Sequence, residues 1–350
     1  MRENPFSLDF GAKPTLFIPR YVEMSKIINT FSAEKPSTHI FMIMGARGNG
    51  KTVLMSAATE KILENDKWVH VDLSPESDMM SNFASNLYQR GKNKFSKLKI
   101  NISLDLKIAS IGTSSEIDKK YSSTYTDIDS MLEQLKKRDM RVLITVDEAV
   151  NSKKVREFTT YFQHCICEEY PVFLLMTGLY KNIRALQNNK TQTFLKRAPK
   201  LVIETLNKGR IAEKYKEVFS ISDEEAMRIA NHTNGYSYAF QILGYLLFDN
   251  KKQEVTPQIL KEYRLMLGES SYDKIWEELS ENEKLVAWTA ADYPEDTSVK
   301  VLREKLQMSS NKFSTYQNTL EKSGVFAGNS AYGRIRFALP YIGEYIKMQM

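Results

Sequence analysis

Cysteine is scarce in this 350-residue chain, and the two that occur, Cys165 and Cys167, directly follow His164 with one residue between them. The segment has the pattern of a helix, in which residues two apart point to different faces. Such positions do not favour three ligands that converge on one zinc ion. The sequence therefore favours reduced, buried thiols over a metal site.

Long apolar runs are absent as well. The longest, residues 172–176, has the length of a strand and falls far short of the roughly 20 residues that span a bilayer. The N-terminal segment "MRENPFSLDFGAKP" has no apolar signal core. With 42% hydrophobic and 26% charged residues, the composition is ordinary for a globular protein of two or three domains. We therefore expect a cytoplasmic protein with no membrane partner.

Charge of one sign is not in large excess, since the net charge is only +6. Its distribution is uneven: residues 181–217 contain ten Lys or Arg against three acids, whereas residues 270–350 contain ten basic and eleven acidic side chains. The positive excess therefore lies in the middle of the chain, beside the chemical motifs described below.

Short apolar strands alternate with helix-length amphipathic segments from residue 39 to about 203, a pattern that predicts an α/β domain with a mainly parallel sheet. The apolar residues of 99–112 alternate strictly, which predicts a half-buried strand within an insertion spanning residues 92–126. The five strands of the sheet are expected at residues 39–44, 68–73, 141–146, 172–177 and 200–206.

Strand signals stop after residue 206. Residues 208–268 predict helices, with turns at 234–237 and 255–258. From about residue 274, three short helices precede a predicted hairpin at 325–340, whose turn is "GNSAYG". Three helices and a hairpin in this order are typical of a winged helix.

The stretch "GARGNGKT" matches the pattern G-x-x-x-x-G-K-[ST] after an apolar strand and at the start of a helix, the context of a phosphate-binding P-loop. Its glycines let backbone N–H groups turn toward phosphate oxygens, and the helix N-terminus adds partial positive charge. Lys51 is expected to reach the β- and γ-phosphates, and Thr52 to ligate Mg²⁺. The predicted nucleotide-contacting residues of this stretch are Gly45, Ala46, Arg47, Gly48, Asn49, Gly50, Lys51, Thr52 and Val53.

Two adjacent carboxylates, Asp147 and Glu148, end the apolar strand of "VLITVDEAV". Like charges this close repel each other unless a cation meets them. Asp147 is expected to hold the hydration shell of Mg²⁺, and Glu148 to orient and deprotonate the attacking water. The second acid favours ATP hydrolysis over phosphoryl transfer to a metabolite, so a small-molecule kinase is the less favoured interpretation.

Two further residues are candidates for the reaction. Thr177 ends the next strand and could contact the γ-phosphate or the water, although a threonine at a strand end is also common without such a role. Arg197, in the basic stretch "FLKRAPK", could stabilise transition-state charge in cis or from a neighbouring copy, with Arg184 as the weaker candidate. A solvated basic helix face is the alternative for both arginines.

In their order along the chain, these stretches resemble the AAA+/STAND-type ATPases of the prokaryotic ORC/Cdc6-like branch. "NPFSLDFGAKPTLFIPRYVEM" resembles the opening of that group, with Pro19 where glycine is usual and with Arg20 and Glu23 in place. The resemblance implies that Arg20 lies at the adenine. "HTNGYSYAFQILGY" resembles the lid helix but carries no arginine, and Tyr236 in it is either a core aromatic or a residue near the base.

The resemblance implies ATP and Mg²⁺ as cofactors, and four parts: an N-terminal arm (1–16), a P-loop ATPase core (17–206), a helical lid (207–272) and a winged-helix domain (273–350). In many winged helices the third helix enters the major groove of DNA. Duplex DNA and protein partners, including a second copy of the chain, both remain open for this domain. The residues available for phosphate contacts are Lys312 on the third helix and Arg334 and Arg336 on the wing.

Overall fold

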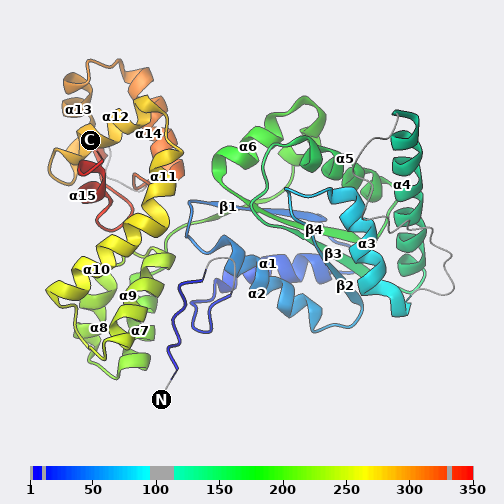
Figure 1. Ribbon diagram of the computed structural model, residues 1–350, viewed down its shortest axis with the longest axis horizontal. Coiled ribbons are helices and arrows are strands. Elements are labelled where there is room, and N and C mark those ends of the chain that lie inside the picture. The colour runs from blue at the N-terminus through cyan, green and yellow to red at the C-terminus, as the bar shows by residue number, and fades with distance from the viewer. Residues whose placement is uncertain (1–2, 10–12, 95–113, 329–332, 350) are drawn as a thin grey trace.

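The computed structural model describes residues 3–9, 13–94, 114–328 and 333–349. Figure 1 shows an α/β core, a group of helices beside it that we call the lid, and a C-terminal group of short helices above the lid. The alternating strand predicted at residues 99–112 lies outside the described residues, and so does most of the turn predicted at 328–333.

The core contains five parallel strands in the order β2-β3-β4-β1-β5. The parallel sheet and the five strand positions predicted from the sequence are confirmed. β1 and β4 are buried along their whole length, which explains why they read as continuous apolar runs. The strands are β1 (Ile40–Gly45), β2 (Trp68–Asp72), β3 (Arg141–Val146), β4 (Val172–Gly178) and β5 (Lys200–Ile203).

Helices cover both faces of the sheet, since alternate strand residues point to opposite sides. Met42 and Met44 of β1 face a core that they share with α3, α4, α5 and α6, whereas Phe41 and Ile43 face α1 and α2 (Figure 1). The covering helices are α1 (Tyr21–Ser32), α2 (Lys51–Leu63), α3 (Met79–Gly91), α4 (Ser114–Lys136), α5 (Lys153–Cys167) and α6 (Tyr180–Asn188).

The carboxyl ends of β1, β3 and β4 lie side by side. Val146 of β3 pairs with Met176 of β4, and Met44 of β1 pairs with Gly178 of β4. The loops that follow these strands therefore leave the sheet at one edge, which is where α/β sheets bind ligands. The short helix η2 (Lys190–Lys196) leads back from α6 to β5.

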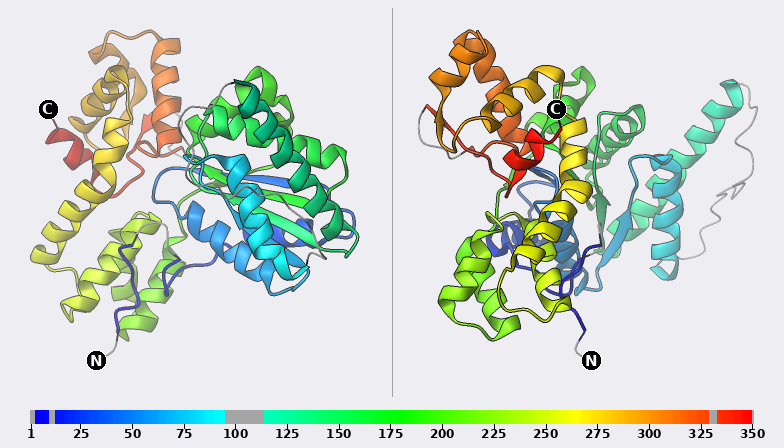
Figure 2. Two further views of the ribbon diagram at one scale, coloured as in Figure 1. Left: turned by 45° about the vertical axis from the view of Figure 1, so that its right-hand side comes forward. Right: turned by 60° about the vertical axis from the view of Figure 1, so that its left-hand side comes forward.

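Four helices form the lid, and local capping sets where they begin. The side chain of Asn207 accepts from two backbone N–H groups at the start of α7, Ser222 and Glu225 form a capping box on α8, and Thr256 caps α10. The lid helices are α7 (Lys208–Phe219), α8 (Asp223–Asn231), α9 (Ser237–Asp249) and α10 (Pro257–Leu267). In both views of Figure 2 the N-terminal arm runs alongside them, and Phe6 is buried in their core.

A continuous helical run links the lid to the C-terminal part. α10 is followed directly by the π-helical turn η3 (Gly268–Tyr272) and then by α11 (Asp273–Glu277). The boundary between lid and C-terminal domain that the sequence predicted, after residue 272, falls inside this run. Single π-helical turns within α-helices often mark functional positions.

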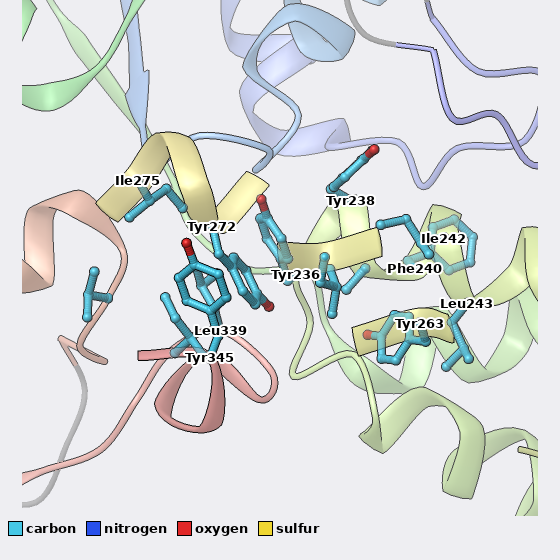
Figure 3. Close-up of a cluster of buried hydrophobic side chains, with 14 of the residues drawn as sticks. Tyr236, Tyr238, Phe240, Ile242, Leu243, Tyr263, Tyr272, Ile275, Leu339 and Tyr345 are labelled. Carbon is cyan, nitrogen blue, oxygen red and sulfur yellow. The ribbon is translucent and has the colours of Figure 1, made fainter. Parts of the chain in front are cut away.

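The C-terminal part contains the helices α12, α13, α14 and α15 together with short antiparallel pairings. β6 pairs with β7, and Phe326 forms a bridge with Phe337. Tyr272 and Tyr345 join this part to the lid in one aromatic core (Figure 3). The elements are α12 (Glu281–Ala291), β6 (Thr297–Ser298), α13 (Val299–Lys305), α14 (Ser310–Ser323), β7 (Arg334–Ile335) and α15 (Ile342–Lys347).

The cysteine segment lies in α5, the helix that the sequence predicted. Cys165 is buried as expected, but the prediction of a buried thiol is wrong for Cys167, which is exposed. Burial raises the pKa of the Cys165 thiol to about 12. Within residues 3–9, 13–93, 124–328 and 333–349, no three His, Cys, Asp or Glu side chains gather where they could hold a metal ion. Nor does any helix in those ranges have the length and apolar character to cross a membrane.

Candidate nucleotide site

The P-loop between β1 and α2 has a backbone that requires glycine. Gly48 and Gly50 have φ of 73° and 85°, in the left-handed region that L side chains rarely adopt. The residues from Arg47 to Val53 all line a cavity of about 420 Å³, whereas Gly45 and Ala46 lie behind its wall. Gly45 packs so closely that a Cβ there would lie 2.7 Å from the carbonyl oxygen of Ile203.

The cavity is formed by three parts of the chain and has two chemically different ends. Arg47, Lys51, Thr52, Asp147 and Glu148 form a charged end on the core. The other end is largely apolar and lies between the arm with α1 and the lid. Its lining includes Pro14, Phe17, Ile18, Met24, Leu206, Tyr238 and Phe240. A small ligand with an anionic and an apolar end would match this lining.

Asp147 is held by hydroxyl groups on both sides. Thr52 Oγ1 donates to Asp147 Oδ2 at 2.9 Å, and Thr177 Oγ1 donates to Asp147 Oδ1. Thr177 Oγ1 also accepts the backbone N–H of Glu148 at 3.1 Å. Thr177 is fully buried and does not line the cavity, so its hydroxyl positions the two acids. Direct contact of Thr177 with a phosphate or water stays a prediction.

Glu148 adopts an unusual backbone conformation, with φ of 52°. Non-glycine residues with left-handed backbones are uncommon and gather at functional sites. Hydrogen bonds from the Glu148 N–H to Asp147 and Thr177 maintain this conformation. The side chain is 70% exposed, and its Oε1 lies 3.5 Å from a guanidinium nitrogen of Arg47. Glu148 thus presents a solvated carboxylate at the charged end of the cavity.

Lys51 is buried at the base of the P-loop, where its Nζ donates to the carbonyl oxygen of Ala46 at 2.9 Å. Burial lowers the pKa of Lys51 to about 8, although Asp147 and Glu148 act in the opposite direction. The carbonyl oxygen of Ala46 carries no net charge, whereas phosphate oxygens in the cavity would give the Lys51 ammonium group anionic partners.

A magnesium ion fits the oxygen donors at this end. The Thr52 hydroxyl and the Asp147 carboxylate lie within hydrogen-bonding distance of each other, so one cation could contact both oxygens. Mg²⁺ prefers oxygen ligands and usually takes one or two carboxylates together with substrate phosphates and water. The predicted metal-ligating pair, Thr52 and Asp147, is therefore placed together by the fold.

Arg20 also lines the cavity, and its guanidinium holds the P-loop. Nη2 donates to the carbonyl oxygens of Asn49 and Glu204, at 3.0 Å and 2.6 Å. Ser237 of the lid donates to the same Asn49 oxygen at 3.2 Å. Burial lowers the pKa of Arg20, partly offset by nearby acids that include Glu23. These bonds connect the start of α1, the P-loop and the lid. Contact between Arg20 and an adenine stays a prediction.

The structure does not bring Arg197 to this site. Arg197 is exposed after η2 and is not among the residues that line the cavity. Arg184 is exposed as well, and its guanidinium donates to the hydroxyl of Tyr180 at 3.1 Å. Neither arginine reaches the cavity of its own chain. The prediction that Arg197 stabilises transition-state charge therefore stays open only for the cavity of a neighbouring copy.

Tyr236 is a core aromatic, which decides between the two roles considered for it. It is fully buried, and its hydroxyl is 2.6 Å from that of Ser271 in η3. Figure 3 shows its tip directed toward the loop after β1, where a Cβ on Gly48 would lie 2.0 Å from the hydroxyl oxygen. Tyr236 therefore fixes the lid directly against the P-loop.

The sequence analysis missed the lid residues that complete the cavity. Ser237 and Gln241 both line it, and Gln241 accepts the backbone N–H of Ser7 at 3.0 Å. Their signal was present in the sequence: they are polar residues four apart, on one face of the otherwise apolar helix α9. Lys274 of α11 lines the cavity too, far from the P-loop in sequence.

The three residues predicted to contact nucleic acid are exposed on the C-terminal part. Lys312 lies in the first turn of α14, and Arg334 and Arg336 lie on the segment that contains β7. The guanidinium of Arg334 donates to the carbonyl oxygen of Asp296 at 2.7 Å. Their role in binding stays a prediction.

Comparison with solved structures identifies the architecture. A Walker-type ATPase of Pyrococcus abyssi aligns with a TM-score of 0.62 at 13% identity, over 95% of this chain and 96% of that one. The ORC2 protein of Aeropyrum pernix, in ADPNP–ADP complexes, aligns with a TM-score of 0.60 at 11% identity, over 97% and 95%. The chain has the fold of these ATPases. Cdc6p from Pyrobaculum aerophilum aligns with a TM-score of 0.50 at 14% identity, over 97% and 96%. The sequence itself matches no protein-family model and no curated relative.

Proposed function

We propose that this protein is a Mg²⁺-dependent ATPase that acts as a molecular switch. The observation that carries the proposal is the arrangement at the sheet edge: Asp147 is bonded to the P-loop hydroxyl of Thr52, and Glu148 lies beside it at the same cavity as Lys51. The arrangement supports roles for Asp147 as a metal ligand, Glu148 as the base and Lys51 as the phosphate-binding cation, which are the roles that hydrolysis of a nucleoside triphosphate requires.

ATP fits the two ends of the cavity. The phosphates would lie at the P-loop, while the base would lie against apolar residues such as Phe17, Met24 and Phe240. The ORC2 protein of Aeropyrum pernix, which shares the fold, forms complexes with ADPNP and ADP. An adenine nucleotide is therefore the ligand we expect.

The residues divide the reaction among them. Backbone N–H groups of the P-loop and Lys51 bind the phosphates, and Thr52 and Asp147 hold the metal. When bound, Mg²⁺ stabilises negative charge on the oxygens of the transferring phosphoryl group. Glu148 accepts a proton from the attacking water, and its carboxylate, 70% exposed and 3.5 Å from Arg47, lies at the charged end of the cavity where that water would bind. The Thr177 hydroxyl holds both acids in position through hydrogen bonds to the Asp147 carboxylate and the Glu148 N–H.

Glu148→Gln tests the assignment of the base. We expect ATP binding to remain within about twofold and turnover to fall by about 10²–10⁴, because the amide cannot accept the proton. Lys51→Ala is expected to abolish ATP binding. Glu64→Gln, an exposed carboxylate at the end of α2, is the matched control and should leave both quantities unchanged. Unchanged turnover in Glu148→Gln would show that the base is elsewhere.

The second part of the proposal concerns the C-terminal domain, which we take to be a winged helix formed by α12, α13, α14 and the strands around β7. Gly324, at the end of α14, lies so close to the P-loop that a Cβ on it would be 2.5 Å from the side chain of Ala46. A change in the P-loop on nucleotide binding would therefore reach this domain directly. Nucleotide state is thus proposed to set the domain's position.

Duplex DNA is the partner proposed for the exposed face of this domain, with Lys312, Arg334 and Arg336 as phosphate contacts. The expected result is a salt-sensitive gel shift that weakens when the three residues are replaced by Gln. The alternative is a signalling or defence ATPase that acts through protein partners or self-association. It predicts no DNA binding, together with a change in molecular mass between ADP and ATP.

A further inference from the structure

A cluster of three charged residues joins the P-loop to the end of the helical run that leaves the lid. Glu278 lies just after α11, and its Oε1 accepts from a guanidinium nitrogen of Arg47 at 2.9 Å. Its Oε2 is 2.9 Å from Nζ of Lys181 on α6. Each oxygen of this carboxylate thus has its own cation. We call Arg47, Lys181 and Glu278 the ionic lock.

The Arg47–Glu278 pair of the lock is more protected from water than an ordinary surface ion pair, whereas the side chain of Lys181 is 53% exposed. The side chains of Arg47 and Glu278 are 25% and 32% exposed, whereas pairs such as Arg228–Glu224 are 71% and 77% exposed. Burial raises the pKa of Glu278, but hydrogen bonds from Lys181 and Arg47 outweigh it, so the pKa lies below its ordinary value. Glu278 is therefore ionised at neutral pH, and its contacts hold the lid's end against the core.

Arg47 belongs to the nucleotide cavity as well as to the lock. It lines the cavity next to Lys51 and Thr52, and its second guanidinium nitrogen lies 3.5 Å from Glu148. Its Nε is buried and has no hydrogen-bond acceptor within the described chain. The guanidinium thus retains a donor that Glu278 and Glu148 leave unsatisfied.

A phosphate would compete with Glu278 for this guanidinium. Arginine binds phosphate through a planar fork of donors, and a terminal phosphate carries more negative charge and more acceptor oxygens than one carboxylate. Such a phosphate would lie among the P-loop N–H groups that flank Arg47. Turning toward it would take Arg47 away from Glu278 and leave Lys181 as the sole cation on that carboxylate.

The effect would be transmitted by the rest of the helical run. Glu278 follows α11, which continues from η3 and α10 without a loop. On the other side of the lock, Lys322 of α14 lies over the ring of Tyr180, 4.9 Å from its centre, and Gly324 lies against Ala46. Loss of the Arg47–Glu278 pair would leave this interface with the Lys181–Glu278 pair, the cation–π contact of Lys322 and the apolar contact of Gly324 with Ala46.

We propose that Arg47 exchanges Glu278 for the terminal phosphate of bound ATP, so that the ionic lock opposes ATP binding and opens when ATP binds. This inference rests on the proposed function. It assigns the Arg47 side chain to discrimination between ATP and ADP, and it assigns Glu278 and Lys181 to control of domain position.

Three substitutions separate the parts of the lock. Glu278→Gln removes the carboxylate that competes for Arg47 without removing a phosphate ligand, so it should tighten ATP binding on the order of tenfold and change ADP binding little. Lys181→Gln leaves the Arg47–Glu278 pair in place and removes the cation that would stay on Glu278 after the exchange, so it should not tighten ATP binding. Arg47→Gln removes the phosphate ligand and should weaken ATP binding while leaving ADP binding nearly unchanged. In the Arg47→Gln background, Glu278→Gln should have no further effect on ATP binding.

The controls address folding and charge. Glu281→Gln, a 90% exposed carboxylate three residues away, changes the same charge outside the lock and should bind both nucleotides like the wild type. Thermal unfolding of each variant checks that it is folded. Spin labels at positions 64 and 300, with Cys167 replaced by Ser, report the separation of core and C-terminal domain. Without nucleotide, the Glu278→Gln distances should resemble those of the wild type with ATP.

The outcomes are distinct. Equal ATP affinity in the wild type and Glu278→Gln would overturn the lock, and so would tighter ATP binding by Lys181→Gln or an Arg47→Gln variant that binds ATP and ADP as the wild type does. If Lys51→Ala binds ATP normally, the proposed function itself fails. If Lys51→Ala abolishes ATP binding but the lock variants bind ATP as the wild type does, the ionic lock is wrong and the proposed function stands.

Discussion

The lowered pKa of Lys51 predicts that ATP binding takes up a proton. Burial brings this pKa to about 8 in the free protein, where the side chain donates only to the carbonyl oxygen of Ala46. Phosphate oxygens would favour the charged form and restore the pKa to its ordinary value of 10.5 or above. As pH rises through 8, Lys51 of the free protein loses its proton. ATP binding is then coupled to uptake of a proton from solution, which weakens the observed affinity.

The magnitude follows from linkage. With a free pKa of about 8 and a bound pKa of about 10.5, the Kd for ATP should rise about eightfold between pH 7.5 and pH 9. At pH 9 about 0.9 proton should be taken up per ATP bound. The nucleotide itself contributes little in this range, because a terminal phosphate with a pKa of about 6 is already ionised.

Isothermal titration calorimetry in two buffers of different ionisation enthalpy measures the proton uptake, and the same titrations give Kd at each pH. Lys51→Arg keeps its charge throughout this range, so the rise in Kd and the proton uptake should both disappear. Lys61→Arg, on the exposed face of the same helix, should behave as the wild type does. The reasoning fails if Lys51→Arg shows the same rise in Kd, or if the wild type takes up no proton at pH 9.

Three further substitutions test the packing around the loop. Gly48→Ala combines a φ of 73° with a clash against Tyr236, so it should lower the free energy of unfolding by at least about 1–3 kcal/mol and weaken ATP binding, measured by chemical denaturation and titration. Thr177→Val removes the hydroxyl between Asp147 and the Glu148 N–H; turnover should fall at least about tenfold while ATP still binds, and unchanged turnover would contradict the positioning role. Ser271→Ala leaves the buried Tyr236 hydroxyl without its partner and should lower the free energy of unfolding by about 1–3 kcal/mol; an unchanged value would contradict the role of this hydrogen bond.

The strands and the P-loop were predictable because their signals are local. A buried parallel strand is apolar on both faces, and the glycines and Lys51 of the P-loop lie within eight residues of sequence. The placement of Asp147 beside Thr52 also followed, since carboxyl ends of parallel strands share one edge.

The remaining features depend on pairs that are distant in sequence. Arg47 and Glu278 are 231 positions apart, and nothing near either residue marks it as a partner of the other. In the same way, Tyr236 reads only as an aromatic residue until the lid is folded against the P-loop. The prediction for Arg197 shows that closeness in sequence can also mislead. Its basic stretch lies near the catalytic motifs in sequence, but Arg197 is on the surface, outside the cavity.

The fit of Tyr236 against Gly48 makes two distant positions depend on each other. A side chain at 48 would occupy the space that the tyrosine hydroxyl fills, so it could be accommodated only with a smaller residue at 236. Residue 236 in turn reaches η3 through Ser271. Positions 48, 236 and 271 should therefore vary together among relatives of this protein, and a chain with a bulkier P-loop should carry a compensating change in its lid.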